Sequence, residues 1–110
     1  MASIHAASGE LIDILPFGTA LRQAASATLV REDHVEVFRL VLLSGKSLPG
    51  HDHPRVITIQ CIEGSIELIA AGRAQAMRAG TLVYLSGGVP HTLTAIEDSS
   101  LLVTLLLRRE

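Results

Sequence analysis

Two histidines one residue apart, His51 and His53, stand in the stretch PGHDHPRVI, residues 49–57. In a β-strand, residues i and i+2 project from the same face about 7 Å apart, so both imidazoles can approach one point while Asp52 faces away. Neutral imidazole is the commonest protein ligand for transition metals. The spacing therefore suits chelation of a divalent metal, although a His-x-His pair by itself also occurs without one.

A third histidine, His91, follows the turn Gly87-Gly88-Val89-Pro90 and begins another apolar stretch. It is therefore expected at a strand end, where an open site can be built. Three imidazoles leave coordination positions free on Fe, Zn, Mn or Ni.

The elements that must position these residues are predicted to be short strands, because apolar runs and turn residues alternate about every ten positions. This rhythm predicts an all-β fold with two facing antiparallel sheets. Residues 19–24 are expected to form a single helical turn or a loop across one end. The ten expected strands cover residues 10–15, 27–32, 34–44, 47–53, 55–62, 65–70, 73–78, 81–85, 91–97 and 100–107.

The composition of the chain limits the classes of protein to which it can belong. The chain has 110 residues, is 48% hydrophobic and 18% charged, and carries a net charge of −2 without a long basic run, which predicts one folded domain over 1–110 that does not bind nucleic acid. A single cysteine and the lack of a leader-like or membrane-spanning stretch predict a cytoplasmic protein that is not bound to membranes. Residues 1–9 are expected to be a flexible arm or one exchanged within a dimer.

The runs at residues 37–43 and 101–107 are apolar on both alternating faces. In an antiparallel sheet this pattern indicates that the outer face is covered as well. A second subunit is the simplest cover, which predicts a homodimer. The alternative is that the N-terminal arm lies over this face.

Two spaced patterns resemble the conserved motifs of the cupin superfamily. The first motif is glycine, five residues, His, one residue, His, three residues, a position that is usually Glu, six residues, glycine. The second has glycine, five residues, a usual Pro, one residue, glycine, two residues, His, three residues and a usual Asn. In this sequence the positions are Gly45, His51, His53, Ile57 and Gly64 for the first motif, and Gly80, Ser86, Gly88, His91 and Ala95 for the second.

The resemblance implies a small single-domain cupin: a double-stranded β-helix, or jelly-roll barrel, of six to eight strands, with a divalent metal inside and frequent dimerisation. It places His51, His53 and His91 on the three histidine ligand positions. It also suggests a chemistry, because some cupins with three-histidine iron sites are dioxygenases.

The departure from the motif at Ile57 removes the anionic ligand. Glu63 is expected at the far hairpin turn, and Gln60 has the wrong strand parity to replace it. Three neutral imidazoles would leave the metal a stronger Lewis acid that favours an anionic, chelating ligand. Alternatively, the missing carboxylate means that the site binds metal weakly or not at all.

Four further residues are candidates for ligand binding: Arg55, Ile57, Cys61 and Tyr84. Arg55 either pairs with an anionic ligand or is a solvated turn residue, and Tyr84 either donates a hydrogen bond or packs against a sheet or a subunit. Cys61 is expected to point into the barrel, as an inert thiol or a soft ligand. An apolar cavity is expected to be lined by Ile57, Ile59, Leu82 or Val83, Leu93 and Val103.

Two functional hypotheses follow. The first is a metal-dependent enzyme, an oxygenase or isomerase acting on a small anionic chelating molecule. The second is a small-molecule-binding or sensor module without catalysis.

Overall fold

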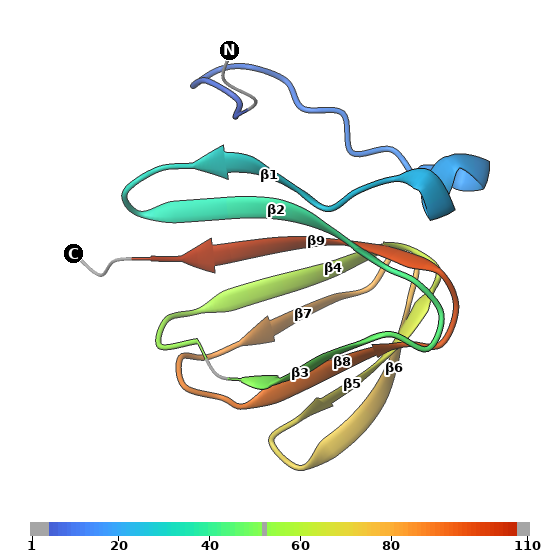
Figure 1. Cartoon of the computed structure of the whole chain (residues 1–110). Coiled ribbons are helices and arrows are strands. Elements are labelled where there is room, and N and C mark those ends of the chain that lie inside the picture. The colour runs from blue at the N-terminus through green and yellow to red at the C-terminus, as the bar shows by residue number, and fades with distance from the viewer. Residues whose placement is uncertain (1–4, 52, 108–110) are drawn as a thin grey trace.

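A computed structural model describes residues 5–51 and 53–107, with the side chains of residues 49–51 outside the description. The regular elements of the described part are almost all strands (Figure 1). One 3-10 helix, η1 (Gly18–Gln23), precedes them, as expected for that segment. The strands are β1 (Ala27–Arg31), β2 (Val35–Leu42), β3 (Ser47–His51), β4 (Ile57–Glu63), β5 (Ser65–Ala70), β6 (Arg73–Arg78), β7 (Leu82–Leu85), β8 (His91–Ala95) and β9 (Ser99–Leu106).

The strands form two sheets, which we call sheet A and sheet B. Sheet A has the order β1-β2-β9-β4-β7, and sheet B has the order β3-β8-β5-β6. Every pairing is antiparallel. Except for the hairpins β1–β2 and β5–β6, successive strands cross from one sheet to the other, as Figure 1 shows for β2 and β3 and for β8 and β9, and this topology is that of a jelly roll. The predicted fold class is confirmed.

Alternating side chains of the two sheets fill the space between them. In β4, for example, Ile57, Ile59 and Cys61 are buried, and in β5 Ile66 and Leu68 are buried. The buried cluster comprises Leu42, Ile57, Ile59, Cys61, Ile66, Leu68, Ala70, Met77, Leu85, Leu93, Ala95, Leu101 and Val103. Burial of this apolar surface is the main driving force for the fold.

Two expectations about the strands are wrong. Residues 10–15 form no strand, and the described part has nine strands rather than ten. Instead, a backbone hydrogen bond from the Ala6 amide to the Leu29 carbonyl, at 2.8 Å, links this end of the chain to the edge of β1. The expected segments at 65–70 and 73–78 match β5 and β6, whose hairpin fixes both ends.

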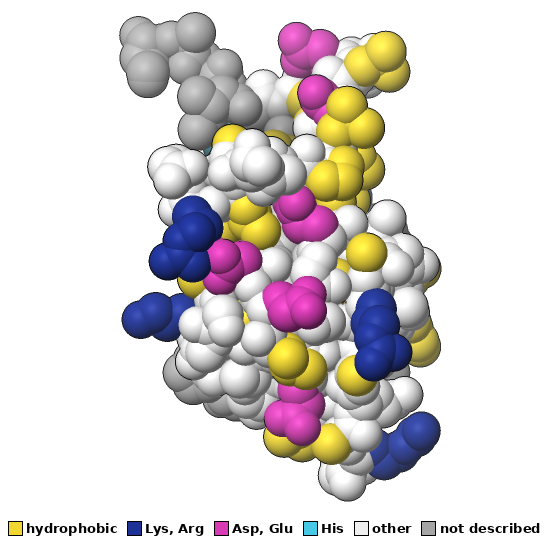
Figure 2. All heavy atoms as spheres, turned by 90° about the vertical axis from the view of Figure 1, so that its right-hand side faces the viewer, with side chains coloured by type: hydrophobic (Ala, Val, Ile, Leu, Met, Phe, Trp, Pro, Cys, Tyr) yellow, Lys and Arg dark blue, Asp and Glu magenta, His cyan; other side chains and the backbone are white. Residues whose placement is uncertain are grey.

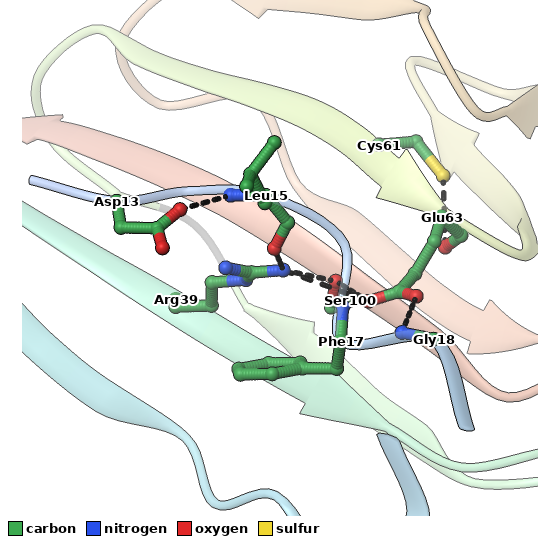
Figure 3. A network of polar contacts seen from close by, with 8 residues as sticks. All are labelled: Asp13, Leu15, Phe17, Gly18, Arg39, Cys61, Glu63 and Ser100. Atoms are coloured by element: carbon green, nitrogen blue, oxygen red, sulfur yellow. Dashed lines mark hydrogen bonds and ion pairs between the residues drawn. The ribbon is translucent and has the colours of Figure 1, made fainter. Parts of the chain in front are cut away.

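The N-terminal segment is fastened to sheet A by a buried polar cluster (Figure 3). Glu63 accepts hydrogen bonds from the amides of Phe17 at 2.8 Å and Gly18 at 3.1 Å, and from the Ser100 hydroxyl at 2.6 Å. Arg39 lies 3.5 Å from the same carboxylate and donates to the Leu15 carbonyl at 2.7 Å. The contacts of Leu15, Phe17 and Gly18 join the segment to β2 and β4 of sheet A, so the segment does lie over one end of this sheet.

The electrostatics of the cluster favour the ion pair. Burial would raise the pKa of Glu63, but the hydrogen bonds from Ser100, Phe17 and Gly18 and the charge of Arg39 together hold it below its ordinary value. Burial lowers the pKa of Arg39, and the nearby charge of Glu63 partly compensates. The Arg39 guanidinium also stacks over the Phe17 ring at 4.0 Å from its centroid.

Among the described residues, no helix has the length and apolar character needed to cross a membrane.

Candidate metal centre

The three histidine positions meet at one end of the barrel. His51 ends β3 and His91 begins β8, and their backbones are paired directly across the two strands. His53 lies in the loop after β3, where its carbonyl accepts a hydrogen bond from the Gly88 amide at 2.7 Å. This contact joins the loop that carries His53 to the turn that leads into His91.

Gly87 explains how closely these two loops approach. A Cβ atom at this position would lie 2.4 Å from the Pro54 carbonyl oxygen, so only glycine fits without displacement of the backbone. The glycine-rich turn before His91 therefore has a packing role in bringing the histidine loops together.

The ring of His91 is oriented by its own turn. Its Nδ1 lies 3.1 Å from the Val89 carbonyl, which can only accept, so Nδ1 carries the proton in this contact. Nε2 is then the nitrogen that holds a lone pair, as a metal ligand requires. A backbone carbonyl that fixes the tautomer in this way is a common feature around metal-binding histidines.

The contacts of the His53 ring fit either of its two neutral tautomers. Its Nδ1 lies 3.0 Å from the Arg55 amide, which can donate to it, and 3.2 Å from the Arg55 carbonyl, to which a protonated Nδ1 can donate. Binding of a metal through Nε2 requires the second arrangement. The donor chemistry of both rings therefore fits a divalent transition metal. The side chain of His51 and all of Asp52 lie outside the described residues.

Ile57 occupies the motif position that is usually glutamate. It begins β4 opposite Leu85 and Leu105, and its side chain is buried in the barrel interior. Glu36 lies on the same row of sheet A, because both Glu36 and Ile57 are paired with Leu105. Its carboxylate therefore belongs to the inward face of the sheet. Two strand spacings separate Glu36 from Ile57, about 10 Å between their Cα atoms, and Glu36 pairs instead with Arg31 at 3.2 Å.

No replacement for the missing carboxylate is found within the described side chains. Among them, no three His, Cys, Asp or Glu residues gather closely enough to hold a metal. Gln60 lies on the opposite face from Ile57, and Glu63 is at the far end of β4 in the cluster with Arg39. The histidine positions therefore provide neutral donors only.

Arg55 lies at the rim of the histidine end. Its Nε atom is buried and makes no hydrogen bond within the described part of the chain. A buried N–H donor without an acceptor is costly, and an anionic ligand would supply the acceptor.

The other two candidates lie apart from the histidines. Cys61 is fully buried four residues along β4 from Ile57, about 13 Å away, and burial raises the pKa of its thiol. Tyr84 is 62% exposed, because it alternates with the inward-facing Val83 and Leu85 and so projects from the outer face of sheet A. The geometry thus brings Arg55 and Ile57 to the histidine end and leaves Cys61 and Tyr84 elsewhere.

Four of the residues expected to line an apolar cavity belong to the buried core. Ile57, Ile59, Leu93 and Val103 are all at most 5% exposed and belong to the buried cluster, while Leu82 projects outward. A recess of about 230 Å³ remains beside His91. Its lining is Ile69, Ala70, Ala71, Gly72, Pro90, His91 and Thr92. Ile69 and Thr92 alternate with the buried Leu68 and Leu93, so part of this recess lies on the outer face of sheet B.

Sequence reasoning did not identify Glu36 or the pairing of Arg39 with Glu63. Glu36 has the same parity as Phe38 and Leu40, so the alternation of β2 could have placed it inside. No local sequence pattern indicated the contacts of Arg39, because its partners lie 22 to 61 residues away in the chain.

The sequence model of the cupin domain matches residues 38–107, which include all three histidine positions. Together with the jelly-roll topology, this match shows that the chain belongs to the cupin superfamily. No curated protein matches the sequence.

Solved structures show the same fold. A conserved protein of unknown function from Streptococcus pyogenes has a TM-score of 0.76 at 19% identity and covers 100% of this chain and 98% of its own. A cupin superfamily protein from Desulfitobacterium hafniense has a TM-score of 0.76 at 13% identity, with 89% and 95% covered.

An enzyme is also among the similar structures. Salicylate 1,2-dioxygenase from Pseudoaminobacter salicylatoxidans, solved as a variant, has a TM-score of 0.68 at 16% identity. The match covers 73% of this chain and 25% of that protein. At these identities the likeness establishes the fold alone.

Proposed function

We propose that this cupin binds a divalent transition metal, Fe, Zn, Mn or Ni, through His51, His53 and His91. The observation that carries the proposal is that backbone pairing and loop contacts bring the three positions to one end of the barrel. The Val89 carbonyl further orients His91 for binding through Nε2. The metal would supply Lewis acidity or, if iron, redox chemistry, while the chain supplies the ligands and the rim.

The chemistry around the site favours a small anionic ligand. Three imidazoles leave the two positive charges of the metal uncompensated, and the buried Nε of Arg55 adds a donor. We therefore propose an enzyme, an oxygenase or isomerase, whose substrate is a small molecule that chelates the metal through an anionic end.

The second candidate function is a binding or sensor module of the same ligand class. It is favoured by the apolar character of the buried interior, to which Ile57, Ile59, Leu93 and Val103 belong. Oxygen consumption and product formation with a panel of diketones, thiols and hydroxy acids separate the two, because a sensor binds without turnover.

The metal proposal is tested by elemental analysis of protein purified without a histidine tag. We expect about one metal per chain in the wild type and loss of most of it in the double variant His51→Ala, His91→Ala. The matched control is His34→Ala, an exposed histidine between β1 and β2, which should retain metal. Equal metal content in all three proteins would overturn the site.

The role of Arg55 is tested with oxalate as the probe, by calorimetric titration of the metal-loaded protein. Arg55→Leu is expected to weaken oxalate binding by about tenfold or more, since it removes a charge-assisted contact worth at least ~1.4 kcal/mol. Arg78→Leu, at the exposed end of β6, is the matched control. Equal affinities of the two variants would exclude Arg55 from the ligand site.

We also propose that the protein acts as a homodimer in the cytoplasm. The single thiol, Cys61, is free and buried, which suits a reducing compartment.

A further inference from the structure

Glu36 is a charged residue on the inward face of the barrel. It has the strand parity of Phe38, which packs against the buried core, and its side chain is only 16% exposed. In Figure 2, which shows the end of the barrel opposite the histidine positions, acidic and basic side chains stand on the surface in the ordinary way. A carboxylate turned inward is costly to desolvate and adds nothing to an apolar core, so packing alone does not account for it.

An ion pair with Arg31 fixes the direction of this charge. Arg31 lies opposite Glu36 on the edge strand β1, and its Nη1 is 3.2 Å from Oε2 of Glu36. The Arg31 side chain is 62% exposed, so the positive member of the pair stands toward solvent and the negative member lies nearer the barrel interior. The second carboxylate oxygen, Oε1, has no partner within the described part of the chain.

Glu36 lies at the histidine end of the barrel. The row of sheet A that begins with Ile57 runs through Leu105 to Glu36, with about 10 Å between the Cα atoms of Ile57 and Glu36. Arg55 lies two residues before Ile57 and so borders the β4 side of this end, whereas Glu36 borders the β2 side. A positive and a negative group thus flank the histidine end from different strands.

Space for a ligand adjoins Glu36. A recess of about 300 Å³ is lined by Ser26, Ala27, Thr28, Glu36 and Phe38. Thr28 is paired with Phe38, so these two side chains and Glu36 project from the inward face of the β1–β2 hairpin. A carboxylate, hydroxyl groups and an aromatic ring form a lining that suits a cation or an N–H donor and not an anion.

We infer that Glu36 determines the specificity of the ligand site, by selecting a small molecule that carries an ammonium group or another N–H donor at the end opposite its anionic, chelating group. This specificity rests on the proposed function and names its substrate class. An ammonium group donates charge-assisted hydrogen bonds to Glu36. A second carboxylate at the same place is repelled, and the low effective dielectric constant of the interior strengthens this repulsion. Zwitterionic chelators are therefore favoured over dicarboxylates.

Calorimetric titration of the metal-loaded protein with three 2-hydroxy acids tests this specificity. The three share the chelating end but differ at the far end: 4-amino-2-hydroxybutyrate carries an ammonium group, 2-hydroxyglutarate a carboxylate and 2-hydroxybutyrate no charge. The wild type should bind the amino compound at least about tenfold more tightly than 2-hydroxyglutarate, with 2-hydroxybutyrate between them. Constant ionic strength keeps the screening of the charges equal.

Three variants locate the effect. Glu36→Gln removes the charge while it preserves the shape of the side chain, and it should reduce the preference for the amino compound by about tenfold. Glu36→Asp keeps the charge and should keep most of the preference. Glu67→Gln, the matched control at an exposed position on the outer face of sheet B, should leave the preference unchanged. All four proteins should bind 2-hydroxybutyrate equally, which shows that the fold and the metal site are intact.

The failure of this specificity is distinguished from the failure of the metal site. Equal affinity of the wild type for the amino compound and 2-hydroxyglutarate, or an unchanged preference in Glu36→Gln, would overturn the role of Glu36 while binding of 2-hydroxybutyrate still supports the metal site. Loss of 2-hydroxybutyrate binding in Glu36→Gln would also overturn it, because the residue would then be structural. If the wild type binds none of the three acids, the proposed ligand site fails, and the specificity of Glu36 falls with it.

Discussion

Glu63→Gln removes the charge that balances Arg39 while it preserves the shape of the side chain. The Arg39 side chain is only 5% exposed, so the variant leaves a buried guanidinium without its counter-ion. The amide NH₂ of glutamine also cannot accept a hydrogen bond, so the amides of Phe17 and Gly18 and the hydroxyl of Ser100 compete for one oxygen.

The expected cost is about 3 kcal/mol. Removing one member of a buried ion pair typically costs ~3–5 kcal/mol, and the lower end applies because the Glu63 side chain retains 15% of its exposure. A loss of this size is a large part of the ~5–15 kcal/mol that stabilises a typical domain. It corresponds to a decrease in Tm of roughly 12–20 °C.

Urea denaturation at pH 7 and pH 3.5 measures the effect. The pKa of Glu63 is lowered in the folded protein, so the unfolded chain binds this proton more tightly. The stabilisation is therefore complete above the ordinary glutamate pKa of 4.5 and is lost as the pH falls below it. The difference between wild type and Glu63→Gln should be largest at pH 7 and smaller at pH 3.5.

Two comparison variants make the result specific. Glu67→Gln, on the outer face of sheet B, should change stability by less than about 0.5 kcal/mol. Arg39→Met combined with Glu63→Gln should cost less than the sum of the two single changes, because neither charge is then left unpaired. Equal urea midpoints for the wild type and Glu63→Gln at pH 7, or a difference independent of pH, would refute the reasoning.

Gly64→Ala should destabilise by about 3 kcal/mol, because a Cβ here would lie 2.3 Å from a neighbouring carbonyl at a φ of +86°, whereas Gly45→Ala, in open space at a φ of +83°, should cost only about 1 kcal/mol. Thermal melts that rank the two equally would contradict this account. The buried thiol of Cys61, with its raised pKa, should react with a disulfide reagent at pH 8 at least about 100-fold more slowly in the native than in the urea-unfolded protein; comparable rates would show that it is accessible. Ile57→Glu should tighten metal retention against a chelator by at least about tenfold, and unchanged affinity would mean that position 57 does not face the site.

The fold class was predictable because its signals are local. The two-residue periodicity of the strands and the glycines of the turns report on neighbouring residues, and they located β5 and β6 at their observed bounds. The spacing of His51, His53 and His91 was sufficient to recognise the cupin motifs, which the match over residues 38–107 supports. The segment at residues 10–15 was mistaken for a strand because periodicity does not reveal whether a partner edge is available.

The tertiary structure decided which face of each strand points inward and which residues lie opposite that face. Strand parity places Tyr84 and Val83 on different faces, but only the stacking of the two sheets directs Val83 inward and Tyr84 outward. The same stacking brings Ile57, Ile59, Leu93 and Val103 together in the buried core. It also joins Arg39 to Glu63, because contacts between residues far apart in the chain depend on strand register and not on local pattern. The sequence by itself therefore determined the class of fold and the spacing of the histidines, and the packing of sheet on sheet determined their surroundings.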